Sequence, residues 1–351
     1  MRGIAALSVL IYHVVGHRVS IVFGAAEQPR GIFDPLTIDA VVSAIVTTIF
    51  DGSAAVLAAS LERTPRPTPA TYLGFMLRRL FRLMPAVWFS LGVMIAILCY
   101  YNAMPPLWTM INAFWLGDGI FALNQPLWSI RVELAISAVF PLLLFANWLG
   151  GRRGSLALAI VLTVMTWYGD LPNLFLYLLA FQLGIMLPGF GAPMIRAVPP
   201  RMRIWLFAVA FAIFSVSFNL MRLGVWDELI WLVIKSFAAF YILSHVVYGP
   251  QMKFLHSDWA RQLGNISFGI YLFHGPLMFV AFSVLHGWLP TEFMSQTVSF
   301  GCVALAGVLP ATLLLAWVSY RWVERPCIRW GRSLAEAVPR LSPALRRIEA
   351  N

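Results

Sequence analysis

The sequence predicts an all-α, polytopic membrane helix bundle of about ten transmembrane helices, with both termini in the cytoplasm. Of its 351 residues 60% are apolar and only 11% are charged. Apolar stretches long enough to cross a bilayer also recur along the whole chain. This composition excludes an ordinary soluble domain. The three cysteines are scattered, so they predict neither a metal site nor a disulfide framework.

The predicted spans follow one another along most of the chain. We place them near residues 3–23, 38–60, 83–101, 127–149, 155–168, 174–188, 204–221, 229–248, 262–284 and 297–320. The fifth and sixth flank Gly169-Asp170-Leu171-Pro172-Asn173 and predict a helical hairpin, because the proline disfavours one continuous helix. The first span carries Tyr12 and His13 and lacks a small-residue cleavage site, so we expect it to stay in the membrane.

The basic residues indicate the orientation. Most of the 25 Lys and Arg residues fall in segments that a cytoplasmic N-terminus would place inside, whereas only Arg18, Arg30 and Arg222 fall outside. This asymmetry follows the positive-inside rule. The formal net charge of +10 is therefore explained by topology and by contact with anionic lipid headgroups, and it predicts no nucleic-acid partner.

Arg2 and His13 stand at the two ends of an otherwise almost wholly apolar first span. Helical rise places the imidazole roughly 16 Å along the axis from Arg2, about halfway through a hydrocarbon core of about 30 Å. An ionisable group at that depth is costly, so a functional role is the default interpretation. We expect a mostly neutral ring that is free to accept a proton.

A basic cluster precedes the third span, where Arg78, Arg79 and Arg82 are followed by Pro85. Arg78 and Arg82 share a helical face at i, i+4. Guanidinium groups at a helix start can bind phosphates in bidentate fashion. The alternative is that these are ordinary basic residues of a cytoplasmic loop, which from spacing alone is the more frequent case.

Polar residues also surround the start of the fourth span, from Asn124 through Trp128 and Ser129 to Glu133. Ser129 and Glu133 lie four apart and so share a helical face. A carboxylate within a span needs a hydrogen-bond donor or a basic partner in the bundle interior. Glu133 could equally form a structural ion pair or act on a substrate. Trp128 alone is explained by an interfacial aromatic belt.

The ninth span contains a second polar stripe, because Ser267, Tyr271 and His274 follow i, i+4, i+7 spacing. Such a stripe faces a cavity or other helices and not lipid. The last span ends at Trp322-Val323-Glu324-Arg325-Pro326. Taken alone, Glu324 there is an interfacial salt-bridge residue.

Together these motifs resemble the membrane acyltransferase 3 family. The matching elements are Arg2-x10-His13, Arg78-Arg79-x-x-Arg82-x-x-Pro85, Pro126-Leu127-Trp128-Ser129 with Glu133, Ile266-Ser267-Phe268 with Tyr271-Leu272-x-His274, and Glu324-Arg325-Pro326. Each is weak by itself, but all five occur in the family's order. The resemblance implies a membrane acyltransferase domain over residues 1–328, followed by a short basic cytoplasmic tail over 329–351.

The resemblance also implies an activity. A bacterial inner-membrane enzyme of this family transfers an acyl group, most often acetyl from cytoplasmic acetyl-CoA, to a hydroxyl of a surface polysaccharide or a lipid-linked sugar. It binds no permanent cofactor or metal, because acyl-CoA is a co-substrate. His13, Arg2 and Glu133 become the catalytic candidates, and the donor-binding candidates are Arg78, Arg79, Arg82 and Glu324. The acceptor-binding candidates are Asn124, Trp128, Ser129, Tyr271 and His274.

Two departures from the family pattern leave alternatives open. The chain begins one residue before Arg2, where family members carry an aspartate and further residues, so we expect the natural start to lie upstream. The second span lacks about ten residues, roughly 15 Å of helix, which places Asp51 and Gly52 in midmembrane. The alternatives are therefore a catalytically degenerate family member and a transporter or flippase of a glycan or lipid. The sequence shows no clear inverted repeat, and this disfavours a transporter.

Overall fold

The computed structural model describes residues 2–15, 69–168, 172–215, 225–250, 255, 257–290 and 297–348. In these ranges it is helical and contains no β-strand, as the sequence predicts. Five described helical stretches are long and apolar enough to cross a bilayer: Tyr72–Tyr100, Leu127–Thr166, Tyr177–Ala197, Asp258–Trp288 and Ser299–Val338. The predicted span 38–60, with Asp51 and Gly52, lies outside the described residues. The total of ten spans and the orientation stay predictions.

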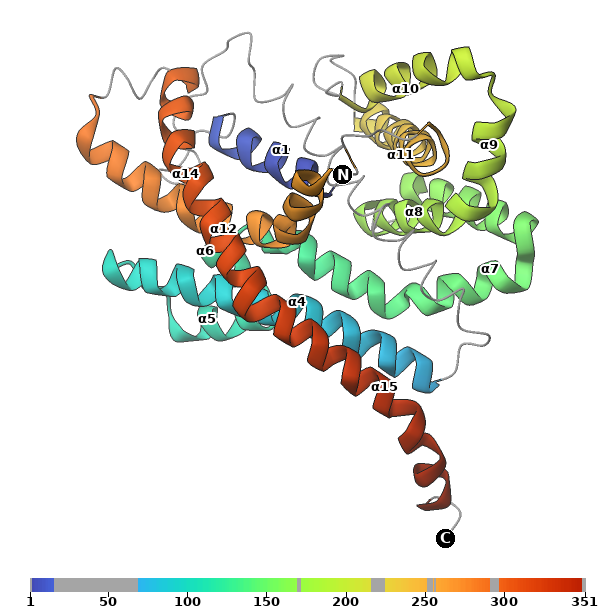
Figure 1. Cartoon of the computed structure of the whole chain (residues 1–351), viewed down its shortest axis with the longest axis horizontal. Coiled ribbons are helices and arrows are strands. Elements are labelled where there is room, and N and C mark those ends of the chain that lie inside the picture. Colours follow the sequence, from blue (N-terminus) through green and yellow to red (C-terminus); the bar gives the residue numbers. More distant parts are fainter. Residues whose placement is uncertain are drawn as a thin grey trace. The chain divides into compact units, whose positions relative to one another are not determined.

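The helices form two compact units, each described here by itself. Unit 1 takes its residues from 1–28, 66–138 and 258–351. Its elements are α1 (Arg2–Val15), α4 (Pro69–Tyr100), α5 (Leu107–Phe114), α6 (Ile120–Leu123), the start of α7 (Leu127–Tyr168), α12 (Asp258–Trp288), α14 (Thr297–Ser319), the π-helical turn η4 (Tyr320–Glu324) and α15 (Arg325–Ile348) (Figure 1).

Unit 2 takes its residues from 29–65 and 139–257. It holds the rest of α7, α8 (Pro172–Met186), the π-helical turn η1 (Leu187–Gly191), α9 (Ala192–Ala197), α10 (Pro200–Ser215) and α11 (Val225–Tyr248). Proline begins both α8 and α10, a position where its missing N–H costs no helical hydrogen bond. α7 is interrupted at Gly151, whose φ of 54° lies in the region that favours glycine. The predicted spans 127–149 and 155–168 are thus separate helices.

Three helices of unit 1, α1, α12 and α14, pack closely against one another. α1 lies against α12 and α14, where Leu10 and Phe282 are buried in one apolar cluster. At Gly269 of α12, an added Cβ would come within 2.8 Å of the Ala316 Cα on α14. Small residues let helix backbones approach in this way, which is how helices associate where lipid surrounds them.

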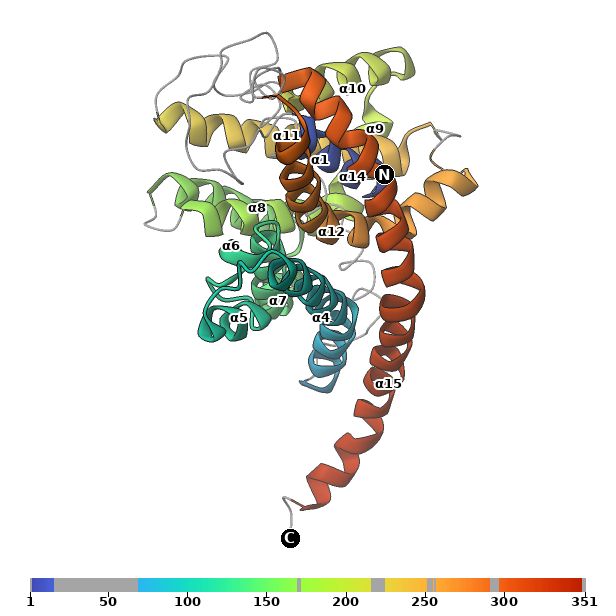
Figure 2. The ribbon, with the colours of Figure 1, turned by 90° about the vertical axis from the view of Figure 1, so that its left-hand side faces the viewer.

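The residues that the sequence predicts as a short basic tail, 329–351, are helical as far as Ile348. α15 continues α14 through η4 and packs along α4. A Cβ at Gly331 would lie 2.5 Å from the Phe81 Cβ, so α15 approaches α4 closely at this point. In both views the C-terminal end of α15 runs past the end of α4 (Figures 1 and 2).

Candidate functional site

Two histidines from distant parts of the sequence meet in unit 1. His13, near the end of α1, stacks on His274 of α12 with ring centroids 5.2 Å apart and planes inclined by 22°. His13 is half-buried and His274 is buried, with 1% of its surface exposed. Tyr271 lies one turn earlier on α12, with its ring centroid 5.7 Å from that of His274. The histidines of the first and fourth family motifs are therefore adjacent in space.

Arg79 of the basic cluster is buried and bound to the start of α7. Its Nη2 donates to Glu133 Oε1 at 2.6 Å and to Ser137 Oγ at 3.0 Å. The Ser137 hydroxyl in turn donates to the Glu133 carbonyl at 2.6 Å. Glu133 thus has the basic partner that a carboxylate within a span requires. Ser137 was not among the predicted site residues, although its i+4 spacing from Glu133 could have indicated it.

The other two arginines differ from Arg79 because their side chains are exposed. Arg78 and Arg82 are both exposed and lie about one turn apart on α4. Arg82 interacts electrostatically with Glu133 and with Glu324. The exposure of these two side chains makes them accessible to an external anion, whereas Arg79 is buried.

Glu324 ends the π-helical turn η4, which packs against α4. Its side chain is 4% exposed and accepts a hydrogen bond from Ser319 Oγ at 3.2 Å. A π-helical turn inserts an extra residue into a helix, and such turns recur at functional sites. The sequence indicated Glu324 as a site residue but gave no sign of this turn.

The turn between α6 and α7 is bound to α12 by hydrogen bonds. Tyr271 Oη donates to the Pro126 carbonyl at 2.9 Å and lies 2.7 Å from Ser129 Oγ. Asn124 is buried, and its Nδ2 donates to the Leu272 carbonyl at 2.9 Å. Trp128 is half-buried and packs against the apolar cluster of α4 and α12. For Arg2, the structure describes only its place as the first residue of α1.

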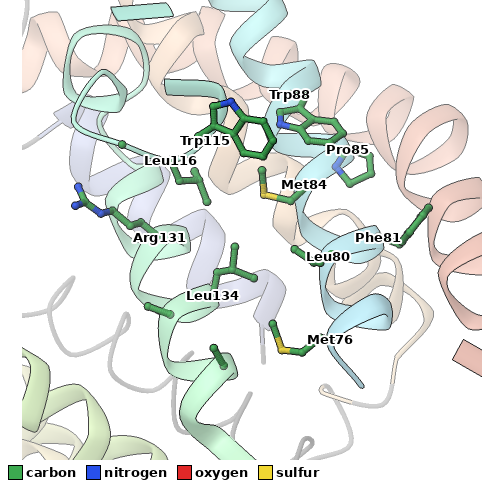
Figure 3. A pocket seen from close by; sticks show the side chains of 13 residues that line it. Met76, Leu80, Phe81, Met84, Pro85, Trp88, Trp115, Leu116, Arg131 and Leu134 are labelled. Atoms are coloured by element: carbon green, nitrogen blue, oxygen red, sulfur yellow. The ribbon is translucent and has the colours of Figure 1, made fainter. Parts of the chain in front are cut away.

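A cavity of about 760 Å³ lies between α4 and the start of α7 (Figure 3). Met84 and Trp88 line it from α4, and Leu134 lines it from α7. Its lining is almost wholly apolar. Arg131 is the charged member, and its Nη1 already pairs with Asp118 Oδ1 at 2.7 Å. This lining suits an apolar chain, because the phosphates of a nucleotide would lose their hydration here without gaining donors.

In the described residues no cluster of three or more His, Cys, Asp or Glu side chains could hold a metal ion. What unit 1 offers instead is a pair of adjacent imidazoles, a buried ion pair and two exposed arginines. An imidazole can take a proton from a hydroxyl, and exposed guanidinium groups can bind phosphate.

Comparison with known proteins places this arrangement in a family. No curated protein and no solved structure matches the chain. A family model described as an acyltransferase domain matches residues 1–320. The match contains every predicted site residue except Glu324, which lies four residues beyond it. Since it covers most of the 351 residues, the protein belongs to the acyltransferase 3 family that its motifs resemble.

Proposed function

We propose that the protein transfers an acyl group, most simply acetyl, from cytoplasmic acyl-CoA to a hydroxyl of a carbohydrate acceptor such as a surface polysaccharide or a lipid-linked sugar. The observation that carries the proposal is the stacked pair of His13 and His274. The membership of the chain in an acyltransferase family supports the reaction class.

In the proposed reaction His13 is the general base. It takes the proton of the acceptor hydroxyl as the oxygen attacks the thioester carbonyl carbon. The new C–O bond forms, the C–S bond breaks, and the proton passes from His13 to the departing CoA sulfur. This kind of proton transfer accelerates a reaction about 10²–10⁴-fold. His274 supports the ring of His13 and lines the acceptor side, where Tyr271 and Ser129 supply hydroxyls.

The donor is proposed to bind through its phosphates to Arg78 and Arg82. Both side chains are exposed, whereas Arg79 is occupied by Glu133. Arg79 and Glu133 then hold α4 against α7 and so position the two exposed guanidinium groups. Glu324 attracts Arg82 and orients it toward the donor. Arg2 is proposed to lie near the same cytoplasmic entrance, in a bacterial inner membrane.

The test uses the purified protein in detergent with labelled acetyl-CoA and candidate glycans. The expected result is acylated glycan from the wild type and none from His13→Ala, with both proteins equally folded by thermal unfolding and gel filtration. His286→Ala is the matched control, since His286 is an exposed histidine at the end of α12, and it should keep full turnover. Full turnover by His13→Ala would refute the assignment of the base.

The same assay separates the two competing functions. A degenerate family member would bind CoA and release no product. A transporter or flippase would move labelled glycan or lipid across a vesicle membrane without acetyl-CoA. Mass spectrometry of surface glycans from cells with and without the gene would then identify the acceptor.

A further inference from the structure

Pro276 removes one hydrogen bond from the interior of α12. Proline has no N–H, so the carbonyl four residues earlier loses its helical donor. In α12 that carbonyl belongs to Leu272, which is fully buried. An unsatisfied carbonyl is costly inside a membrane, where no water can replace the missing donor. Another group must therefore donate to Leu272.

Asn124 supplies that donor. Its Nδ2 lies 2.9 Å from the Leu272 carbonyl oxygen, and its side chain is 3% exposed. The residue is fixed at the end of α6, because its backbone N–H donates to the Ile120 carbonyl at 2.8 Å. Its own carbonyl accepts from the N–H of Leu127 at 3.0 Å. The amide nitrogen is thus held in place by the turn that joins α6 to α7.

The approach of this turn to α12 depends on Gly275. A Cβ at Gly275 would come within 2.8 Å of Asn124 Oδ1 and 3.6 Å of the Pro126 ring. Tyr271 Oη adds a second hydrogen bond, to the Pro126 carbonyl. The turn therefore contacts α12 on both sides of His274, whose ring stacks on His13.

We infer that Asn124 is a positioning residue: its amide replaces the helical hydrogen bond that Pro276 removes, and it thereby fixes the part of α12 that carries His274 against His13. This inference rests on the proposed function for its effect on turnover. It differs from the sequence-based expectation that Asn124 binds the acceptor. Oδ1 of Asn124 has no hydrogen-bond partner among the described residues, so the amide nitrogen carries this role.

A double-mutant cycle tests the inference. Asn124→Leu keeps the branching at Cγ, with a larger side chain, and removes the donor. Pro276→Ala restores an N–H that can donate to Leu272. We expect Asn124→Leu to lower kcat about 10–100-fold, as a small misplacement of a reacting group does, with less change in the KM of the acceptor. In the Pro276→Ala background the same substitution should lower kcat by no more than about threefold, since the donor is then redundant.

The cycle is also measured by thermal unfolding, which does not depend on activity. Asn124→Leu should lower the unfolding temperature much more in the wild-type chain than in the Pro276→Ala background. If Asn124→Leu does not fold by itself, recovery of the fold in the double variant is the expected result. Asn147→Leu, which removes a half-buried amide from unit 2, is the control and should show no coupling to Pro276→Ala.

Two results would overturn the inference. One is an equal loss of stability in both backgrounds. The other is a rise in acceptor KM that Pro276→Ala does not relieve, which would assign Asn124 to acceptor binding. If the wild-type protein transfers no acyl group to any acceptor, the proposed function fails, and the unfolding cycle alone still decides whether Asn124 replaces the bond lost at Pro276.

Discussion

Units 1 and 2 both bury polar side chains among apolar helices, but they satisfy them differently. In unit 2, Asn147 and Gln182 exchange two hydrogen bonds, at 2.7 and 2.8 Å, and each amide is the other's partner. In unit 1, the polar groups include adjacent imidazoles and exposed arginines as well as a closed ion pair. All the predicted site residues lie in unit 1. The presence of a polar residue in a span therefore does not by itself mark a site, because two such residues in unit 2 satisfy each other.

The largest effect on stability is expected from substitutions that break the ion pair between Arg79 and Glu133 in unit 1. Glu133→Ala leaves the Arg79 guanidinium buried without its partner, which should cost about 3–5 kcal/mol of stability. The double variant Arg79→Leu with Glu133→Leu removes both charges and should recover most of that loss. Unfolding in detergent measures the stability, and we expect turnover of the double variant within about tenfold of the wild type. A double variant that folds well but is inactive would show that Glu133 takes part in the reaction itself.

The exposed arginines should behave in the opposite way. Arg78→Gln and Arg82→Gln each remove a charged donor to phosphate, worth about 1.5–3 kcal/mol. Each should raise the KM for acetyl-CoA about tenfold or more and leave kcat nearly unchanged. The unfolding temperature should stay nearly unchanged in Arg78→Gln but fall in Arg82→Gln, because the buried Glu324 then loses the charge that attracts it. Arg131→Gln is the control, because Arg131 is exposed but pairs with Asp118. An equal rise in the KM for acetyl-CoA in Arg131→Gln would show that the loss of any positive charge has this effect, and not the loss of a phosphate contact.

The smallest effect is expected in unit 2. Gln182→Leu removes the two hydrogen bonds with Asn147 and one to the Ser155 carbonyl. Hydrogen bonds between membrane helices contribute about 0.6 kcal/mol on average, so the loss should be about 1–2 kcal/mol with kcat and KM unchanged. Kinetics and thermal unfolding of the same preparation check this. A selective loss of kcat would contradict the division between the units.

The sequence was sufficient for the features that depend on local pattern. Apolar length predicted helices at α4, α7, α8, α10, α11, α12 and α14, and Gly151 separates two of them where two spans were expected. Helical spacing also predicted that Tyr271 and His274 share a face. These inferences need only the period of an α-helix and the composition of neighbouring residues.

The sequence does not predict which residues on different helices pair with each other. Glu133 needed a basic partner, but nothing in its neighbourhood indicated Arg79, 54 positions earlier. The sequence likewise did not indicate that His13 stacks on His274 or that Asn124 donates to the Leu272 carbonyl. Such partners depend on how helices pack, and no local pattern in a single sequence encodes that. The packing of the predicted tail, residues 329–351, on α4 could not be predicted for the same reason, because a basic composition indicates a solvated tail while Gly331 allows close packing on α4.

The wide turn η4 also preserves the direction in which the last helix faces. One residue added to an ordinary α-helix would rotate everything after it by about 100° around the axis. A π-helical turn takes up an extra residue locally, because its hydrogen bonds join residues five apart and not four. Gly331 and Ala335 therefore keep their place against α4, and the irregular spacing is confined to the turn that ends at Glu324.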